Sequence, residues 1–229
     1  MTSFQAHERE EDSPGYATLA AAAVSQAAYR GLEAPAVRPE TDVRRAAWWR
    51  VRGLRRAAQL PLLALVLAVD GATLLVKAQD PGADVPVWIY SLPLLTVFVL
   101  GLAVVGGRRA LRMAGAARRT GPRVRYTLLH SYVTEAPWLV LFADTADDEA
   151  EPLGLLPLRY GPLRDRFREL PPPVGEAVLA GGTEPGTEPG TVVVPWIDGR
   201  AYWPESGLQS FEPDNPQHLR SLSELIRPE

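Results

Sequence analysis

The chain has 229 residues, no cysteine, three histidines and a formal net charge of −3. Without cysteine there is no disulfide scaffold, no thiolate nucleophile and no cysteine-ligated metal site. The histidines follow no metal-binding spacing, and no P-loop, dinucleotide fingerprint or serine-hydrolase motif occurs, so the sequence predicts neither an enzyme nor a cofactor.

The small net charge conceals strongly polarised segments. Residues 38–56 and 108–125 together hold fourteen arginines against Glu40 and Asp42, a net charge of +12. Residues 126–229 hold seven arginines against seventeen acids, a net charge of −10. Blocks of one sign indicate segments that face different surroundings.

The N-terminal part divides into two segments. Residues 1–40 are predicted to form a flexible acidic tail, in which the alanine-rich run 17–28 forms a weak helix. Residues 41–56 are a basic segment that interleaves arginine with Trp48 and Trp49, as segments at a membrane interface do.

Two apolar segments follow. Residues 85–107 contain 23 consecutive residues without a charge, and residues 57–78 are equally apolar except for Asp70 and Lys77. Because about 20 apolar residues in a helix cross a bilayer core, we predict two transmembrane helices joined by an external loop, 79–84. The competing interpretation is a pair of helices buried in a soluble domain.

Charges at the ends of the two segments predict their orientation. Arginines precede the first segment and begin the basic linker 108–121 after the second, whereas the loop carries two acids. The positive-inside rule therefore predicts a two-span protein of the cell membrane with both termini cytoplasmic. We expect anionic lipid headgroups, rather than nucleic acid, to be the partners of Arg44, Arg45, Arg50, Arg52, Arg55, Arg56, Arg108, Arg109 and Arg112.

Asp70 is the one ionisable residue deep in either predicted span. Its depth matches Thr96 on the second helix, so one hypothesis is that Asp70 hydrogen-bonds Thr96 or a symmetry mate and has a functional role. The alternative is that Asp70 lies nearer the outer surface, with Lys77 extending outward.

Small residues recur at helical spacing in both predicted spans. Ala64, Ala68, Gly71 and Ala72 do so in the first, and Ala103 and Gly107 in the second. Small side chains let helix backbones approach closely in lipid, so this spacing predicts a tight hairpin and allows a homo-oligomer.

Residues 122–212 show the texture of a β-rich domain. Short apolar runs separated by turn residues predict strands at 123–133, 138–144, 153–159, 176–180, 191–197 and 200–203. We predict a small, mainly-β cytoplasmic domain of the SH3 or OB size class, either a barrel or a sandwich. A short helix is expected at 162–170, and residues 213–229 should form a C-terminal helix and tail.

Three further features of this domain are expected to be structural. The tandem TEPG repeat at 183–190 should be an exposed loop, and the acidic residues 147–151 should form a solvated turn. His130 lies in an apolar strand and should be a structural residue.

Trp196, Tyr202 and Trp203 cluster around the Asp198-Gly199 hairpin turn. On an outer face they would form a patch for a protein partner, whereas on the inner face they would fill the core, which we favour because a small barrel needs large side chains.

The arrangement resembles a family of two-helix integral membrane proteins of actinobacteria. The arginine-flanked hairpin, Pro173-Val174-Gly175 and the stretch VVVPWIDGRAYWPESG at 192–207 carry the resemblance, which covers residues 42–212. It implies a helical hairpin before a small cytoplasmic β-domain and implies no particular activity. The order of segments is also similar to that of NfeD-like proteins, but their terminal valine-rich strand pattern is missing here.

The sequence therefore predicts a non-enzymatic membrane protein that presents an acidic β-domain to an unknown protein partner. The alternative is a subunit of a small oligomeric channel or transporter that uses Asp70.

Overall fold

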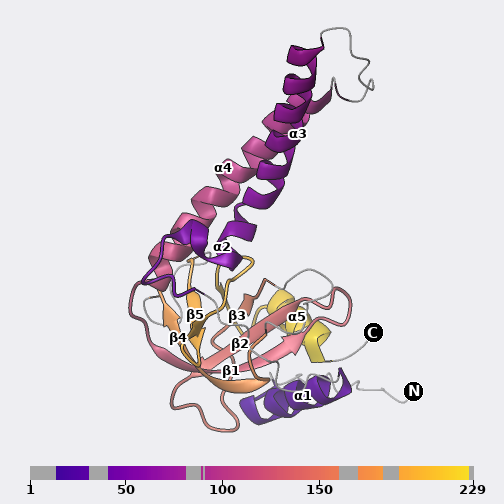
Figure 1. Cartoon of the computed structure of the whole chain (residues 1–229). Helices are drawn as coiled ribbons and strands as arrows, with labels where there is room; N and C mark the ends of the chain where they lie inside the picture. Colours follow the sequence, from indigo (N-terminus) through magenta and orange to yellow (C-terminus); the bar gives the residue numbers. More distant parts are fainter. Residues whose placement is uncertain are drawn as a thin grey trace, which may run out of the picture.

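The structure is a computed structural model that describes residues 14–30, 41–80, 89, 91–159, 170–182 and 191–226. A long helical hairpin projects from one end of a separate antiparallel β-domain (Figure 1). Short helices lie at the base of the hairpin and on the outside of the β-domain. The order of elements agrees with the predicted hairpin followed by a small β-domain.

The hairpin consists of α3 (Leu60–Gln79) and α4 (Leu92–Ala117), each with a proline in its first turn, where proline is compatible with a helix. Both helices are long and apolar enough to cross a membrane. Only 6% of the apolar stretch of α3 and 17% of that of α4 are buried inside the protein. Helices in the core of a soluble domain would be mostly buried, so the structure does not support that alternative.

Helix α4 extends beyond the end of the predicted second span. Residues 108–117, expected as part of a basic linker, continue the helix because arginine, leucine, methionine and alanine are strong helix formers. Ala110, Met113 and Ala114 of this extension are buried against neighbouring elements. The start of the predicted second span, residues 85–88, and most of the predicted external loop lie outside the described residues.

Two short helices, η1 (Trp48–Arg50) and α2 (Arg52–Ala57), lie at the base of the hairpin. Gln59, with a φ of 55°, turns the chain from α2 into α3. A Cβ atom at Gly106 of α4 would lie 2.6 Å from the carbonyl oxygen of Ala57. Glycine at this position therefore allows the end of α2 to pack directly against α4.

The sheet has seven antiparallel strands in the order β6-β5-β4-β1-β2-β3-β7. Residues that follow β6 hydrogen-bond to the end of β3: the Arg159 amide donates to the Trp203 carbonyl (2.9 Å) and the Glu205 amide to the Pro157 carbonyl (2.8 Å). The two ends of the sheet thus meet, as in a barrel. The strands are β1 (Arg123–His130), β2 (Pro137–Ala143), β3 (Gly154–Pro157), β4 (Val174–Ala180), β5 (Val194–Ile197), β6 (Arg200–Ala201) and β7 (Gln209–Ser210).

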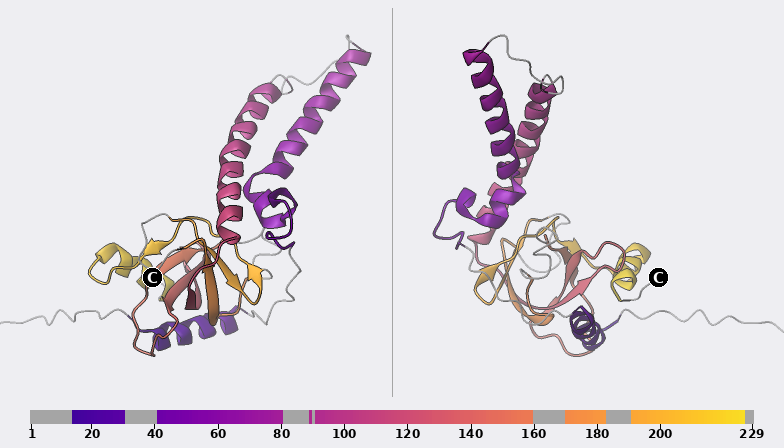
Figure 2. Two further views of the ribbon diagram at one scale, coloured as in Figure 1. Left: turned by 90° about the vertical axis from the view of Figure 1, so that its left-hand side faces the viewer. Right: turned by 45° about the vertical axis from the view of Figure 1, so that its right-hand side comes forward.

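Alternate residues of the central strands point to two different cores, as the period of two in a strand requires. Val124, Tyr126 and Leu128 of β1 face the inside of the sheet. Leu129 of β1 and Phe142 of β2 face outward, where α1 (Tyr16–Tyr29) and α5 (Pro216–Ile226) cover them (Figure 2).

The structure differs from the predicted flexible tail over residues 14–30, because α1 is packed on the sheet. Tyr16, Leu19 and Ala23 are buried, and the Tyr16 ring meets the Phe142 ring edge-on at 5.0 Å. The amides of Tyr16 and Ala17 donate to the carbonyls of the loop 147–150 at 3.1 and 2.9 Å. Because alanines occupy most other positions of this helix, the sequence shows little contrast between its buried and exposed faces.

Most predicted strands are present with shifted ends. The strand predicted at 123–133 stops at His130, because a turn closed by the Ser131 amide and the Ala136 carbonyl (3.0 Å) follows. Asp198 and Gly199 form the predicted tight turn with φ values of 49° and 74°. Strand β7 was not predicted, and α5 lies where a terminal helix was expected. Residues 162–169 of the predicted 162–170 helix and the predicted loop 183–190 lie outside the described residues.

Candidate functional site

The hairpin helices meet along a seam whose residues are spaced alternately three and four apart. The seam residues, half-buried or buried, are Leu63, Val66, Asp70, Thr73 and Lys77 on α3, and Leu92, Thr96, Val99, Ala103 and Gly106 on α4. This spacing is typical of helices that pack at a small left-handed crossing angle.

The small residues singled out in the sequence are distributed differently from the prediction. Ala103 lies in the seam, but Ala64, Ala68, Gly71 and Ala72 are exposed on the outer side of α3. A Cβ atom added at Gly107 would meet nothing within 4 Å. The glycine at which another backbone approaches α4 closely is Gly106, beside Ala57 at the end of α2. The small face of α3 is therefore not used within the hairpin.

Asp70 and Thr96 meet across the seam. The Thr96 hydroxyl Oγ1 donates a hydrogen bond to Asp70 Oδ2, so the contact expected from their matched depth is present. One carboxylate oxygen of Asp70 is thus satisfied within a single hairpin, which reduces the cost of placing this side chain among apolar residues.

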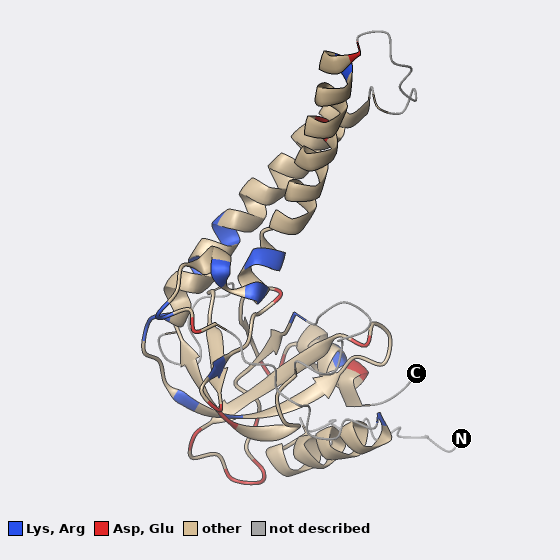
Figure 3. Ribbon diagram, viewed as in Figure 1, with Lys and Arg blue, Asp and Glu red and all other residues tan. Residues whose placement is uncertain are grey.

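Arginines surround the base of the hairpin, and we call residues 42–58 together with residues 108–119 the collar (Figure 3). Arg45, Arg50, Arg55, Arg108 and Arg112 are exposed, and Arg52, Arg56 and Arg109 are half-buried. Arg45 lies 3.7 Å from Asp42 with 90% of its side chain exposed, so this ion pair contributes little.

Arg44 differs from the other predicted lipid-facing arginines because its side chain contacts the β-domain. Its guanidinium lies 3.9 Å from the centre of the Trp196 ring, a cation–π contact. Arg44 Nε and Trp196 Nε1 both donate to the Ala117 carbonyl at the end of α4, at 3.5 and 3.2 Å. Arg118 donates back to the carbonyls of Val43 (3.1 Å) and Ala46 (3.3 Å).

A shared apolar cluster joins the collar to the β-domain. Val51 and Leu54 from the collar pack with Met113 of α4 and with Val194 and Trp203 of the β-domain. A Cβ atom at Gly181, which has a φ of +86°, would lie 2.5 Å from Ala116 Cβ. The positive φ and the close contact both require glycine here, and they bring the β4–β5 connection against α4.

The aromatic residues around the Asp198-Gly199 turn belong to the cores. Tyr202 and Trp203 are 7% and 8% exposed, and Trp196 is half-buried against the collar. These three side chains therefore form no exposed aromatic patch.

Arg159, which was not a predicted site residue, follows β3 and is half-buried. Its backbone amide bonds to Trp203, and Trp203 packs in the cluster that contains Ala110 and Met113 of α4. Partial burial, followed by the nearby charge of Arg109, lowers the pKa of the Arg159 guanidinium, which Glu205 partly offsets. No sequence motif distinguishes this arginine from the others.

On the outer face of the sheet, Gln26 of α1 links three elements. Its side-chain amide donates to the Leu225 carbonyl of α5 (2.6 Å), and its Oε1 accepts from the His130 amide of β1 (2.9 Å). Burial, and secondarily the charge of Arg30, lowers the pKa of His130 to about 4. His130 is therefore neutral at physiological pH and buried under the end of α1.

Among the residues that the structure describes, no three histidine, aspartate or glutamate side chains are grouped to hold a metal ion. No protein-family model, curated protein or solved structure matches the chain.

Proposed function

We propose that the chain is a non-enzymatic, two-span protein of the cell membrane that holds its β-domain at the cytoplasmic surface for protein interaction or assembly. The observation that carries this proposal is the exposed apolar surface of the hairpin. Only 6% of the apolar stretch of α3 and 17% of that of α4 are buried inside the protein. Exposed apolar area on this scale is unstable in water and suited to lipid.

The distribution of charge supports the proposed orientation. The arginines gather at the end of the hairpin that meets the β-domain, and the far end carries Lys77 and Asp80 (Figure 3). The positive-inside rule assigns the arginine-rich end to the cytoplasm. The junction supports a fixed placement of the β-domain, because Arg44, Trp196 and Arg118 tie the collar, α4 and β5 together.

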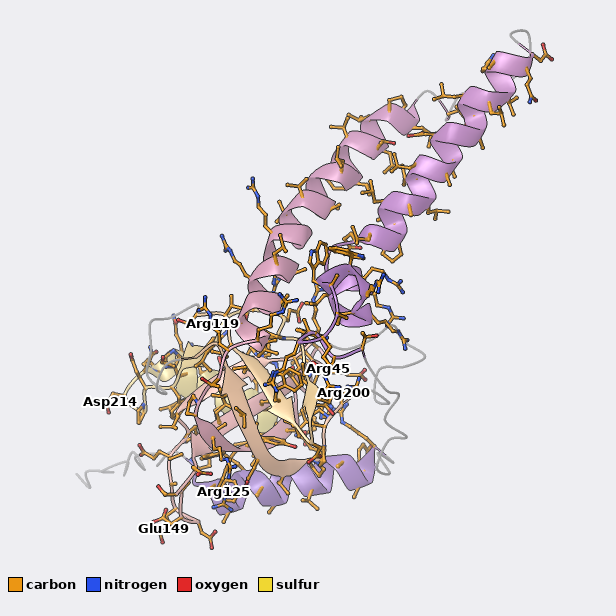
Figure 4. All side chains as sticks on the ribbon, turned by 60° about the vertical axis from the view of Figure 1, so that its left-hand side comes forward. Arg45, Arg119, Arg125, Glu149, Arg200 and Asp214 are labelled. Carbon is orange, nitrogen blue, oxygen red and sulfur yellow. The ribbon has the colours of Figure 1, made fainter. Side chains whose placement is uncertain are left out.

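The acidic end of the β-domain supports a basic protein partner. The loop between β2 and β3 exposes Asp147, Asp148 and Glu149, and Figure 4 places Glu149 beside α1 at the end far from the hairpin. Such a surface faces away from anionic lipid and can steer a positively charged partner toward it.

Two measurements test the proposal. Full-length protein in native membranes should resist extraction by alkaline carbonate, and extraction into the soluble fraction would contradict a spanning hairpin. Partners cross-linked to the wild type in these membranes should be lost from the triple variant Asp147→Asn, Asp148→Asn, Glu149→Gln. They should be retained by a matched variant in which Glu212 and Asp214, also exposed, are neutralised. Equal recovery of partners by both variants would exclude the acidic loop as the docking surface.

A second candidate function is a subunit of an oligomeric channel or transporter, favoured by the hydrogen-bonded Asp70–Thr96 pair in the hairpin seam. An aspartate at such a depth is a default candidate for an ion or proton pathway. Reconstituted protein should then conduct protons or ions, and Asp70→Asn should abolish the flux. Absence of flux through the wild-type protein would exclude this function.

A further inference from the structure

Helix α1 has no charged residue among its 14 residues. One side of the helix is buried on the sheet, and the other side, which we call the outer face, exposes Ala17, Ala21, Val24, Ala28 and Tyr29, with Thr18 and Ser25 as its polar members. Val24 is 50% exposed and Tyr29 is 93% exposed. A helix on the surface of a globular protein normally carries charged residues opposite its buried side, whereas a helix that is apolar nearly all round is normally covered on both sides. The outer face therefore has the composition of a contact surface, whose centre is typically depleted of charge.

Acidic side chains border one end of the outer face. The Tyr16 amide donates to the Ala150 carbonyl (3.1 Å), and a Cβ atom at Gly15 would lie 3.0 Å from the Glu149 Cα atom, so the first turn of α1 is fixed against the β2–β3 loop. Figure 4 shows Arg125 and Glu149 at this end of α1, and Arg125 is half-buried with its guanidinium 3.7 Å from the centre of the Tyr16 ring. The loop itself holds no basic residue and exposes Asp144, Asp147, Asp148, Glu149 and Glu151.

The position of α1 argues against a second copy of this chain as the occupant of the outer face. Helix α1 lies at the end of the β-domain opposite the hairpin in both views of Figure 2, and its outer face is turned away from the sheet. Two copies that paired face to face about a twofold axis would point their hairpins in opposite directions. The two hairpins could then not cross one membrane, so the occupant is a different protein.

The outer face suits a helix rather than an added strand. A strand that joins a sheet needs the free backbone N–H and C=O groups of a sheet edge, whereas a helix presents only side chains. Ala17, Ala21, Val24 and Ala28 are spaced four, three and four residues apart, so they lie along one stripe of α1. Their small size lets the backbone of a second helix approach closely.

We propose that the outer face of α1 and the acidic β2–β3 loop together bind one amphipathic helix of a cytoplasmic partner protein. The apolar side chains of that helix lie against α1, and its lysines or arginines lie against the acidic loop. The apolar stripe supplies the contact area, and the opposite charges determine which end of the bound helix lies beside the first turn of α1. This inference rests on the proposed interaction of the β-domain with a basic partner, and it adds the surface that binds and the form of the bound segment.

The test places the photoreactive residue benzoylphenylalanine at one of two positions of the full chain in native membranes. Replacing Tyr29 exchanges one exposed aromatic side chain for another at the far end of the outer face, and replacing Glu149 probes the acidic end. With a rise of about 1.5 Å per residue, the two ends of α1 are about 20 Å apart. Cross-links from the two positions should therefore map to one basic segment of one partner, about 13 residues apart if the segment is a helix and about six if it is extended.

A variant and a control position show whether the outer face contributes to binding. Val24→Gln should lower the yield of both cross-links about tenfold, because the bound helix would lose apolar contact and the added amide would be desolvated. Amide exchange in α1 should stay at the wild-type rate in Val24→Gln, which separates loss of the partner from undocking of the helix. Benzoylphenylalanine in place of Gln217, an exposed residue of α5 three positions after Asp214, should give no cross-link to this partner.

Four results would overturn the inference. A cross-link from position 149 without one from position 29 would show that the partner binds the acidic loop alone, and would leave the proposed interaction function standing. Cross-links from position 29 between two copies of the chain would make a second copy the occupant. A spacing of about six residues would identify an extended segment, and an undiminished yield in Val24→Gln would exclude the outer face. Absence of cross-links from both positions would contradict the proposed interaction function as well.

Discussion

The docking of α1 on the sheet makes a quantitative prediction. Leu19 is completely buried between α1, the sheet and α5, whereas Val24 on the same helix is 50% exposed. Leu19→Ala should therefore destabilise the docked helix by about 2.7–5 kcal/mol, the range for removal of a buried leucine. Val24→Ala should leave it almost unchanged and serves as the matched control.

Amide hydrogen exchange of the full chain, measured by mass spectrometry, gives the most direct readout. A helix of this length is marginal in water on its own, so protection of the amides of α1 depends on its docking. Leu19→Ala should accelerate exchange in α1 by about 100-fold or more, up to the limit set by the free energy of docking. Exchange in the seam of the hairpin should not change, because α1 and the hairpin lie at opposite ends of the β-domain (Figure 2).

Equal exchange rates in Leu19→Ala and Val24→Ala would refute this reasoning and would show that residues 14–30 are the flexible tail expected from the sequence.

The packing of α1 on the sheet also predicts how a fragment without α1 behaves. A fragment that begins at residue 122 keeps α5 but lacks α1, so it would lose part of the cover over Leu129, Val140 and Phe142. We therefore expect such a fragment to be less stable than the β-domain in the full-length protein.

The remaining predictions concern the hairpin and a buried histidine. Gly106→Ala should destabilise the hairpin by ~1–3 kcal/mol in detergent melts, because its methyl group would meet the Ala57 carbonyl, while Gly107→Ala should be neutral. Thr96→Val should lower the stability of the hairpin by ~1 kcal/mol, because it removes the hydrogen-bond donor to Asp70. The control is Thr73→Val, which loses only a hydrogen bond to the Val69 carbonyl of its own helix. An equal loss of stability in both variants would exclude a special role for the Asp70–Thr96 pair. The pKa of His130 is lowered to about 4, so the unfolded state binds more protons than the folded state between pH 6.5 and 4. The free energy of unfolding should therefore fall by up to ~3 kcal/mol as the pH drops through this window. In His130→Gln, the free energy of unfolding, measured by chemical denaturation at each pH, should depend less steeply on pH.

Local pattern was sufficient to predict much of the fold. The uncharged runs predicted the two long helices, and alternating apolar residues with a tight turn at Asp198-Gly199 predicted most strands. The depth of Asp70 and Thr96 could be matched because a hairpin of two straight helices fixes which residues lie at the same level. Each of these features depends on residues close in sequence or on simple geometry.

Features that depend on three-dimensional contacts were missed. Around Val66 and Val99 the helices are apolar on every side, so no contrast in the sequence distinguished these seam residues from the outer face with Ala64 and Ala68. Arg44 could not be separated from the other arginines without knowing that Trp196 and the Ala117 carbonyl lie beside it.

The absence of cysteine makes the topology directly measurable, because a single introduced cysteine is the only reactive thiol. Asp80→Cys, at the far end of α3, and Glu149→Cys, in the β-domain, can each be probed in intact cells with a maleimide that does not cross membranes. The proposed hairpin predicts labelling of the cysteine at position 80 from outside, and labelling of that at position 149 only after the membrane is opened. Labelling of position 149 in intact cells, or equal labelling of both positions before and after lysis, would contradict it.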